Sequence, residues 1–400
     1  MAALRSNRLR ACCEANAQAG PIPVKTTRQI QSMKLRRSNR LLNVADKLLL
    51  VGPSHSPVTG QSAMFQEAVN IFPGSKVVRI KGTTSKAISK LLFAGELLCA
   101  YLRKVIEPEV EIVYVTVSRS LSGFLRDFTI YIIARACRKK VVFHCHGGDL
   151  DRLFKRKIFG RIACRIYRRA EAVIFLNRFS IPSEMTSSSN VTIIDNCYQG
   201  LDEITADQGP ASKWTRAYRR VTYIGNFIRE KGLDDVLDVI EKISERGCSS
   251  DFLFVAAGKF LNDPEFEAEV RLRAAKMKNL RLIANPERSQ LELELRESNF
   301  LLFPSRYPSE CQPLVVIEAF VAGVIPLITN VNGIREQFSD FSFLEIRPRD
   351  SAAVADILAT NLRHDFSETT VVNRNAAITR FSPEKFRESL VDLISSHLRK

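Results

Sequence analysis

Short apolar runs alternate with helix-like segments along almost the whole chain, and no other feature of the sequence restricts the fold as strongly. Several runs are nearly continuous in Val, Ile, Leu and Phe, which is typical of parallel strands buried on both faces of a sheet. Segments of roughly ten to twenty residues with helical periodicity separate many of the runs, as in βαβ units. The sequence therefore predicts an α/β protein with parallel sheets.

The predicted strands form two series with one interruption. The first series comprises residues 47–51, 76–80, 111–117, 140–144, 172–176 and 191–194, and the second comprises 220–225, 252–257, 280–283, 300–303 and 325–328. The segment between the two series contains Gly, Pro, Ser and charged residues without a strand pattern, which indicates an interdomain linker. We therefore expect a basic tail at 1–46, an N-terminal domain at 47–200, a linker at 201–219, a C-terminal domain at 220–375 and a closing helix at 376–400.

The composition indicates which kinds of partner the protein binds and which cellular compartment it occupies. The net charge of +16 favours polyanionic neighbours, namely nucleic acid, an anionic membrane surface or phosphorylated substrates. The nine cysteines are scattered and form no Cys-x-x-Cys pair, so we expect a reducing, cytoplasmic compartment. Acidic residues interrupt the longest apolar runs, and the sequence therefore predicts no membrane span.

The first forty residues carry nine Lys and Arg residues and a single acid, Glu14. They contain no apolar core of the kind that a secretory signal needs. Their composition predicts a disordered tail or a start codon assigned too early. A basic tether to a membrane or to nucleic acid is the alternative.

The segment 300–336, FLLFPSRYPSECQPLVVIEAFVAGVIPLITNVNGIRE, carries the strongest chemical pattern. A buried strand leads into a polar loop with Glu310, and a helix begins near Gln312 and Pro313. Ligands of open parallel sheets lie beyond the carboxyl ends of the strands, where N–H groups at a helix start favour a diphosphate. Glu318 is either a solvated helix residue or a binding residue. Its apolar neighbours favour binding, because an acid in an apolar stretch needs a partner or a ligand.

Glu310, seven further residues and Glu318 resemble the E-x7-E signature of the family 4 retaining glycosyltransferases (glycosyl transferases group 1), which have the GT-B fold. The resemblance is to bacterial members and extends over nearly the whole chain from residue 47. It implies two facing Rossmann-like domains with a cleft between them. It also implies that Glu310 contacts the donor sugar in catalysis and that Glu318 binds the nucleotide ribose. Three residues at the helix start would line the donor site: Gln312, Pro313 and Leu314.

The segment 221–240, VTYIGNFIREKGLDDVLDVI, resembles the strand–loop–helix element with which the family's C-terminal domain begins. Lys231 matches the lysine that contacts the donor diphosphate, and its charge would stabilise the leaving nucleoside diphosphate. The family commonly has Arg directly after the glycine, where this chain has Asn226. Arg229 is either a substitute for that cation or a solvated side chain. Gly258 matches the family's next loop on the nucleotide side.

The N-terminal domain matches the family more loosely. The loop in residues 52–65 contains Gly60 and Gln61, and it resembles the glycine-containing loop near the donor phosphates and the acceptor. The segment KKVVFHCHGGDL, residues 139–150, resembles the family's strand that ends in H-G-x-D. His146 would therefore approach the donor sugar or the acceptor as a hydrogen-bond donor.

We make separate predictions for five other polar residues of this domain. Asp149 would cap the following helix or take part in function. Asp149 and Asp151 also form a D-x-D pattern, which is the metal-binding motif of the other major glycosyltransferase fold. Here the pattern lies in the domain that is not expected to bind the donor. We therefore expect neither a metal nor another cofactor. Arg126 and Asp127 would lie near the acceptor. His144 is expected to be a buried core histidine.

The resemblance implies a hexosyltransferase that moves a sugar from a UDP- or GDP-linked donor to a glycan or lipid-linked acceptor, in cell-surface polysaccharide or glycolipid synthesis. The basic segment 152–169 would lie on an anionic membrane surface, at the inner face of the membrane, or pack on the sheet with its basic residues solvated. Two alternatives remain. One is a GT-B sugar-nucleotide epimerase, and the other is a non-enzymatic basic protein that binds membranes or nucleic acid. Nucleic acid is not expected, because no base-stacking aromatics accompany the basic residues.

Overall fold

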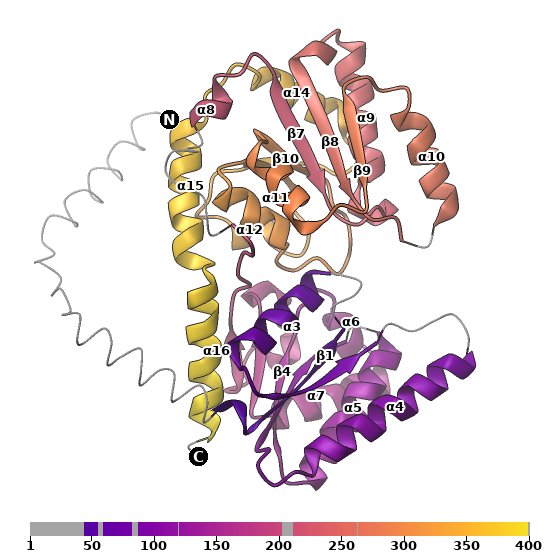
Figure 1. Ribbon diagram of the computed structural model, residues 1–400, viewed down its shortest axis with the longest axis vertical. Coiled ribbons are helices and arrows are strands. Elements are labelled where there is room, and N and C mark those ends of the chain that lie inside the picture. The colour runs from indigo at the N-terminus through magenta and orange to yellow at the C-terminus, as the bar shows by residue number, and fades with distance from the viewer. Residues whose placement is uncertain are drawn as a thin grey trace, which may run out of the picture.

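The computed structural model describes residues 44–54, 59–81, 87–118, 120–201, 211–261 and 263–398. They form two α/β domains, each built around a six-stranded sheet, which confirms the predicted fold class (Figure 1). The predicted tail 1–46 lies almost entirely outside the described residues, as do residues 202–210 of the linker 201–219.

The N-terminal sheet has the strand order β2-β1-β3-β4-β5-β6, and all neighbouring strands are parallel. The chain reverses its direction across the sheet after β2, so the connecting helices cover both faces. Helix α3 packs on one face, and α4, α5 and α7 pack on the other. The elements are β1 (Leu48–Pro53), α3 (Gly60–Ile71), β2 (Lys76–Ile80), α4 (Ala87–Val105), β3 (Ile112–Thr116), α5 (Leu121–Ala136), β4 (Lys140–His144), α6 (Asp151–Phe154), α7 (Lys157–Arg169), β5 (Ala172–Phe175), η1 (Arg178–Ser180), η2 (Ser183–Met185) and β6 (Val191–Ile193).

The C-terminal sheet has the order β12-β11-β10-β7-β8-β9 and is also parallel. Its last strand, β12, is not predicted by the sequence pattern, because it has three residues and one of them is Glu345. The elements are α8 (Ala211–Trp214), β7 (Arg219–Ile224), η4 (Arg229–Lys231), α9 (Leu233–Glu245), η5 (Ser249–Asp251), β8 (Phe252–Gly258), α10 (Pro264–Ala274), β9 (Leu280–Ala284), α11 (Arg288–Arg296), β10 (Phe300–Phe303), α12 (Leu314–Val321), β11 (Ile325–Thr329), α13 (Ile334–Gln337), β12 (Leu344–Ile346), α14 (Ser351–Thr360) and α15 (Ser367–Arg380).

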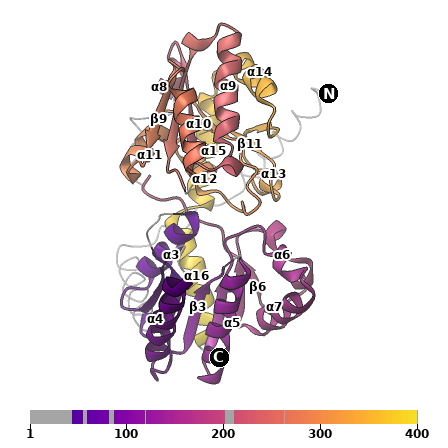
Figure 2. The same cartoon turned by 90° about the vertical axis from the view of Figure 1, so that its right-hand side faces the viewer.

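The last helix, α16 (Pro383–Leu398), returns the chain to the N-terminal domain. Its residues Phe386, Leu390 and Ile394, whose helical spacing predicts a packed face, are buried in the same cluster as residues of β1 and α3. Figures 1 and 2 show α15 and α16 following one another along both domains. The two domains are therefore joined by this helical pair as well as by the linker.

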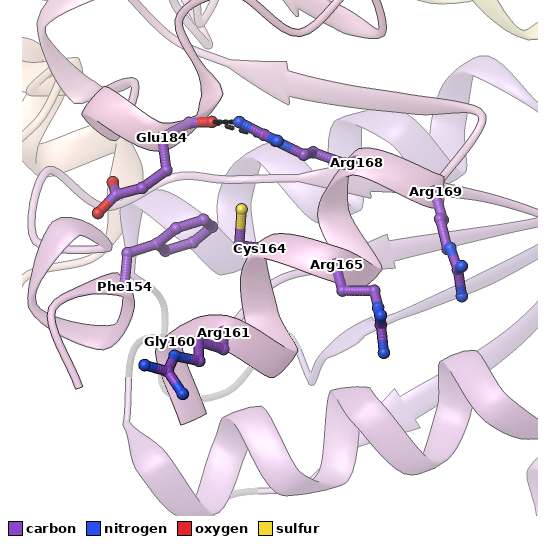
Figure 3. Close-up of a pocket in the computed structure, with 8 residues that line it drawn as sticks. All are labelled: Phe154, Gly160, Arg161, Cys164, Arg165, Arg168, Arg169 and Glu184. Carbon is purple, nitrogen blue, oxygen red and sulfur yellow. Dashed lines mark hydrogen bonds between the residues drawn. The ribbon is translucent and has the colours of Figure 1, made fainter. Parts of the chain in front are cut away.

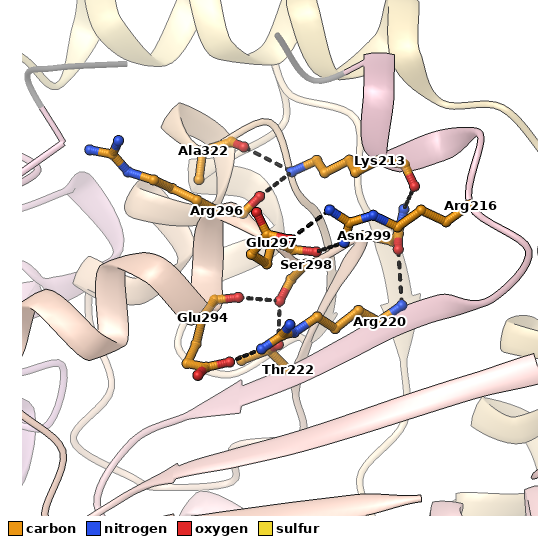
Figure 4. Close-up of polar contacts among 10 residues, drawn as sticks. All are labelled: Lys213, Arg216, Arg220, Thr222, Glu294, Arg296, Glu297, Ser298, Asn299 and Ala322. Atoms are coloured by element: carbon orange, nitrogen blue, oxygen red, sulfur yellow. Dashed lines mark hydrogen bonds and ion pairs between the residues drawn. The ribbon is translucent and has the colours of Figure 1, made fainter. Parts of the chain in front are cut away.

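A buried lysine connects the end of the linker to two helices of the C-terminal domain (Figure 4). Lys213 of α8 is 4% exposed, and its Nζ donates to the carbonyl oxygens of Arg296, at 3.3 Å, and Ala322, at 3.0 Å. These carbonyls end α11 and α12, where the helix dipole favours a positive charge. Asn299 fixes the backbone of Lys213 by donating to its carbonyl oxygen at 3.0 Å. The side chain of Lys213 thus holds the carboxyl ends of α11 and α12 together.

The environment of Lys213 predicts a pH-dependent stability. Burial lowers the pKa of Lys213 from 10.5 to about 7, so between these values the unfolded chain binds more protons than the folded one. The free energy of unfolding should therefore rise with pH in this window, by at most about 1.4 kcal/mol per pH unit. Urea unfolding of the wild type and of Lys213→Met measures this contribution, because the variant lacks the titrating group. A stability difference between the two proteins that stays constant from pH 7 to 9 would contradict it.

Candidate active site

The carboxyl ends of the two sheets face each other across a very short distance at one point. The N–H of Gly148, after β4, donates to the carbonyl oxygen of Ser309, after β10, at 3.3 Å. The Ser309 hydroxyl donates to Asp149 Oδ2 at 2.5 Å. A Cβ on Gly148 would lie 2.2 Å from the carbonyl oxygen of Glu310, so a side chain there would force the loops apart. The glycine is needed for this close approach of two backbones.

Lys231 and Glu310 form an ion pair although they are 79 residues apart in the chain. Ser305 adds a second hydrogen bond to the same carboxylate oxygen, at 2.9 Å. The Glu310 side chain is 7% exposed, whereas that of Lys231 is 21% exposed and its Nζ lies 5.1 Å from the ring centre of Tyr307. The structure therefore brings together the two residues predicted to be catalytic in the C-terminal domain, with the lysine as the more accessible of the two.

Gly232 lets the chain place Lys231 next to this loop. It has a φ of +80°, and a Cβ on it would lie 2.6 Å from the carbonyl oxygen of Pro304. Both conditions exclude most side chains at this position. The local structure therefore explains why residue 232 is glycine, because η4 ends and α9 begins at this residue, next to the loop that follows β10.

Helix α12 begins next to the N-terminal domain. Its N-cap is Pro313, without a side-chain cap, so the first N–H groups of the helix have no intrahelical partner. A Cβ on Gly60, the first residue of α3, would lie 3.8 Å from the side chain of Leu314, the first residue of α12. Gln61 holds this end of α3 by donating to the carbonyl oxygen of Val117 at 2.8 Å. Two positive helix ends thus meet at the cleft, an arrangement that favours an anion.

Glu318 is buried and is paired with Arg288, a residue that the sequence patterns do not single out. The guanidinium donates to the two carboxylate oxygens at 2.7 and 3.3 Å, and also to the carbonyl oxygen of Gln199 at 2.6 Å. Burial raises the pKa of Glu318, and the charge and hydrogen bonds of Arg288 partly offset that rise. The apolar neighbours of Glu318 predict a partner or a ligand, and the partner is this arginine. The binding of a ribose by Glu318 stays a prediction.

Three other predicted donor-site residues have structural partners of their own. The guanidinium of Arg229 pairs with Glu269 of α10 at 2.9 Å and lies 4.6 Å from the ring centre of Phe266. Asn226 lies in the loop after β7, where its carbonyl oxygen accepts from the Tyr223 hydroxyl at 3.2 Å. A Cβ on Gly258 would lie 1.8 Å from the carbonyl oxygen of Gly225. Gly258 therefore allows this loop to pack on β8.

The histidines of the N-terminal domain stack beside the cleft. His144 is fully buried, and its Nδ1 lies 2.5 Å from the Tyr114 hydroxyl, as expected of a core histidine. Burial, and to a lesser degree His146, hold the pKa of His144 well below its usual value. The ring centres of His144 and His146 are 3.9 Å apart, and His146 is partly exposed just before Gly148. A neutral imidazole at position 144 therefore supports the ring of His146.

Asp149 does not cap the helix that follows it, contrary to one of the two expectations for this residue. The N-cap of α6 is Leu150, which offers no side-chain hydrogen bond. The carboxylate of Asp149 accepts from Ser309 of the other domain instead. Arg126 pairs with Asp127, whose buried carboxylate also accepts from the N–H of Ser118 at 2.7 Å. These two residues thus hold the loop between β3 and α5.

The loop that carries Glu310 is held by both domains. Asn177 Nδ2 donates to the sulfur of Cys311 at 3.3 Å, and the backbone N–H of Asn196 donates to Gln312 Oε1 at 2.5 Å. Gln312 Nε2 in turn donates to Asp195 Oδ1 at 2.6 Å. The predicted donor-site residue Gln312 thus has its side chain on the N-terminal domain, and through it this domain helps to set the position of Glu310.

A comparison with family models assigns a class to this site. Residues 210–376 match the model described as Glycosyl transferases group 1, and both ion pairs, Lys231–Glu310 and Arg288–Glu318, lie within the match. The chain is a glycosyltransferase. The match covers the C-terminal domain of the enzyme, and a sequence comparison with curated proteins finds no match. The assignment to family 4 and to the bacterial type stays a prediction.

Solved structures show that the arrangement of the two domains is the GT-B fold. The enzyme is similar to sucrose-phosphate synthase from Thermosynechococcus elongatus, with a TM-score of 0.69, 15% identity, and coverage of 88% of this chain and 99% of that one. It is also similar to HepE from Anabaena in complex with UDP and glucose, with a TM-score of 0.63, 13% identity, and coverage of 87% of this chain and 99% of that one. A third similar structure is α,α-trehalose-phosphate synthase (UDP-forming) from Burkholderia xenovorans in complex with glucose-6-phosphate. Its TM-score is 0.63, its identity 11%, and the coverage is 87% of this chain and 100% of that one.

The contacts of Gln312 predict a selective effect on turnover. Asp195→Asn should weaken the hold of the N-terminal domain on the loop of Glu310 but leave Lys231 and Glu318 in place. We expect kcat to fall about tenfold or more, because small misplacements of a catalytic group are costly, whereas the Kd for the donor should change little. Asp340→Asn, which removes an exposed carboxylate of the C-terminal domain, is the control. An unchanged kcat, or a parallel loss of donor binding, would contradict a positioning role.

Proposed function

We propose that the enzyme is a retaining glycosyltransferase that moves a sugar from a nucleotide-sugar donor, UDP- or GDP-linked, to a glycan or lipid-linked acceptor. The observation that carries this proposal is the Lys231–Glu310 pair beside the unoccupied N–H groups at the start of α12. UDP is favoured over GDP by the neighbours, since HepE was solved with UDP and with UDP-glucose, and the trehalose-phosphate synthase is UDP-forming. These neighbours do not favour the sugar-nucleotide epimerase.

The leaving nucleoside diphosphate is stabilised from the C-terminal domain. Charge develops on the phosphate oxygen as the bond to the sugar breaks, and donors placed around that oxygen lower the barrier. The ammonium of Lys231 and the first N–H groups of α12 are such donors, and Lys231 is accessible enough to leave Glu310 in part for a diphosphate. Glu310 then contacts the sugar, with Ser305 fixing its carboxylate. Glu318, whose carboxylate is oriented by Arg288, is proposed to bind the ribose.

The acceptor side is formed by the N-terminal domain. His146 is proposed to donate a hydrogen bond to the sugar or the acceptor, and Gly60 and Gln61 bring a second helix end to the same side of the enzyme. Arg126 and Asp149 support the loops around it. We propose no covalent intermediate on a side chain. The enzyme is proposed to act in the cytoplasm in cell-surface polysaccharide or glycolipid synthesis.

Association with the inner face of the membrane is part of this proposal. Helix α7 presents Arg161, Arg165 and Arg169 to solvent, and Ile158 in its first turn is 71% exposed. Basic and apolar side chains on one exposed helix favour an anionic lipid surface. Within the described part of the chain, no helix is both long enough and apolar enough to cross a bilayer.

The donor assignment predicts which carboxylate governs turnover and which governs binding. The protein is incubated with a panel of UDP-, GDP- and ADP-sugars, and bound donor and released nucleoside diphosphate are measured by mass spectrometry. Glu310→Gln should lower turnover by orders of magnitude while the donor still binds, whereas Glu318→Gln should weaken binding. Circular dichroism of both variants checks their fold. Normal turnover by Glu310→Gln, or no binding of any sugar nucleotide by the wild type, would refute the site.

The charge at the leaving group also predicts a metal-independent reaction. The ammonium of Lys231 and the helix N–H groups supply positive charge where other enzymes use a divalent cation. Donor turnover should therefore be unchanged by excess EDTA. Loss of turnover with EDTA and its recovery with Mg²⁺ or Mn²⁺ would show that this part of the proposal is wrong.

A further inference from the structure

A cavity on the N-terminal domain has a lining of unusual charge. It lies between α6, α7 and η2, has a volume of about 480 Å³, and includes four arginines, Arg161, Arg165, Arg168 and Arg169 (Figure 3). Small-molecule sites have volumes of roughly 300–1,000 Å³, so the cavity is large enough for a ligand. None of its lining residues belongs to the candidate active site.

The arginines of this cavity form no ion pair within the part of the chain that the structure describes. Arg168 donates to the backbone carbonyl of Glu184 at 2.6 and 3.2 Å, which fixes α7 to η2 but uses no carboxylate. For Arg161, Arg165 and Arg169, no carboxylate of the described residues lies within ion-pair distance, whereas surface arginines such as Arg246 and Arg271 have one. Helix α7 itself contains no acidic residue. The cavity therefore concentrates positive charge, because its lining has four arginines and one carboxylate, that of Glu184.

The shape of the lining restricts the kind of anion. A guanidinium binds a phosphate through two parallel hydrogen bonds, and arginines at positions i and i+4 of a helix, such as Arg161 and Arg165, lie side by side. Phe154 and Cys164 form an apolar wall between α7 and Glu184, as Figure 3 shows. We propose that this cavity is a phosphate-binding site for an ester whose organic part contacts the apolar wall. The ester is either a lipid headgroup or a small soluble phosphate.

Arg161 and Arg165 are the residues to test. Both are exposed and have no hydrogen-bond or ion-pair partner among the described residues, so replacing them should leave the domain intact, whereas Arg168 also has a structural contact. The control removes the same charge elsewhere. Arg363 follows α14, and Arg387 lies on α16, which packs on the opposite face of the N-terminal domain from α7. The double variants Arg161→Gln/Arg165→Gln and Arg363→Gln/Arg387→Gln therefore have equal net charge.

The experiment measures binding of the full chain to two kinds of probe. One is a pair of vesicles, phosphatidylcholine alone and phosphatidylcholine with phosphatidylglycerol, and the other is glycerol 3-phosphate in solution. Wild type should bind one of the phosphate probes, and loss of two arginines should weaken that binding about 30-fold. Binding of glycerol 3-phosphate identifies a soluble ester, and binding of the anionic vesicles alone identifies a lipid headgroup. The control variant should keep wild-type affinity for the same probe.

Two outcomes would overturn the proposal. Binding to neither probe would leave the cavity without a ligand of this class. Equal weakening in both double variants would show that only the net charge of the chain matters. Release of nucleoside diphosphate from a sugar nucleotide is measured alongside, and it should be the same in all three proteins. The phosphate site and the proposed donor site can therefore fail independently.

Discussion

The approach of two backbones at Gly148 is the constraint on which the site depends. With no Cβ at that position, the loop after β4 comes within contact of the carbonyl oxygen of Glu310, and Asp149 reaches Ser309. Asn332 Nδ2 donates to the same Glu310 carbonyl at 2.7 Å and would lie 2.8 Å from a Cβ on Gly148. The backbone of Glu310 is thus fixed by one residue from each domain. A larger residue at 148 would separate the loops, and the effect would be on geometry between domains rather than on the core of either one.

The charges of the cleft are nearly balanced before any substrate is present. Each of the two buried carboxylates has one cation, Lys231 for Glu310 and Arg288 for Glu318. Arg229 is engaged with α10, and the position after Gly225 holds Asn226 rather than a further cation. In the proposed donor complex, the diphosphate shares Lys231 with Glu310. The helix ends at Leu314 and Gly60 then add positive potential without a further charged side chain.

The sequence predicts the fold well because the signal is repeated. Eleven apolar runs separated by helices specify two parallel sheets, and only the short β12 has too few apolar residues to be seen. Contacts between distant segments are different. The need of Glu318 for a partner follows from its apolar neighbours, but nothing local marks Arg288, which lies in a polar helix thirty residues earlier. Asp149 and Gln312 carry local patterns for a cap and a helix start, and each is used instead by the opposite domain. That choice depends on how the domains meet, which no local pattern encodes.

The segments on both sides of the linker contact the helices of the proposed donor site. On one side of it, the carbonyl of Gln199 accepts from Arg288 at the start of α11, and on the other side Lys213 holds the carboxyl ends of α11 and α12. Both flanks of the linker are thus attached to the two helices that carry the Arg288–Glu318 pair. The loop of Glu310 is held from the N-terminal domain by Asn177, Asp195 and Asn196. Gln199 belongs to the same domain, so both carboxylates of the proposed donor site are positioned in part by contacts between the domains. The geometry of the site therefore depends on how the two domains meet and not on the C-terminal fold alone.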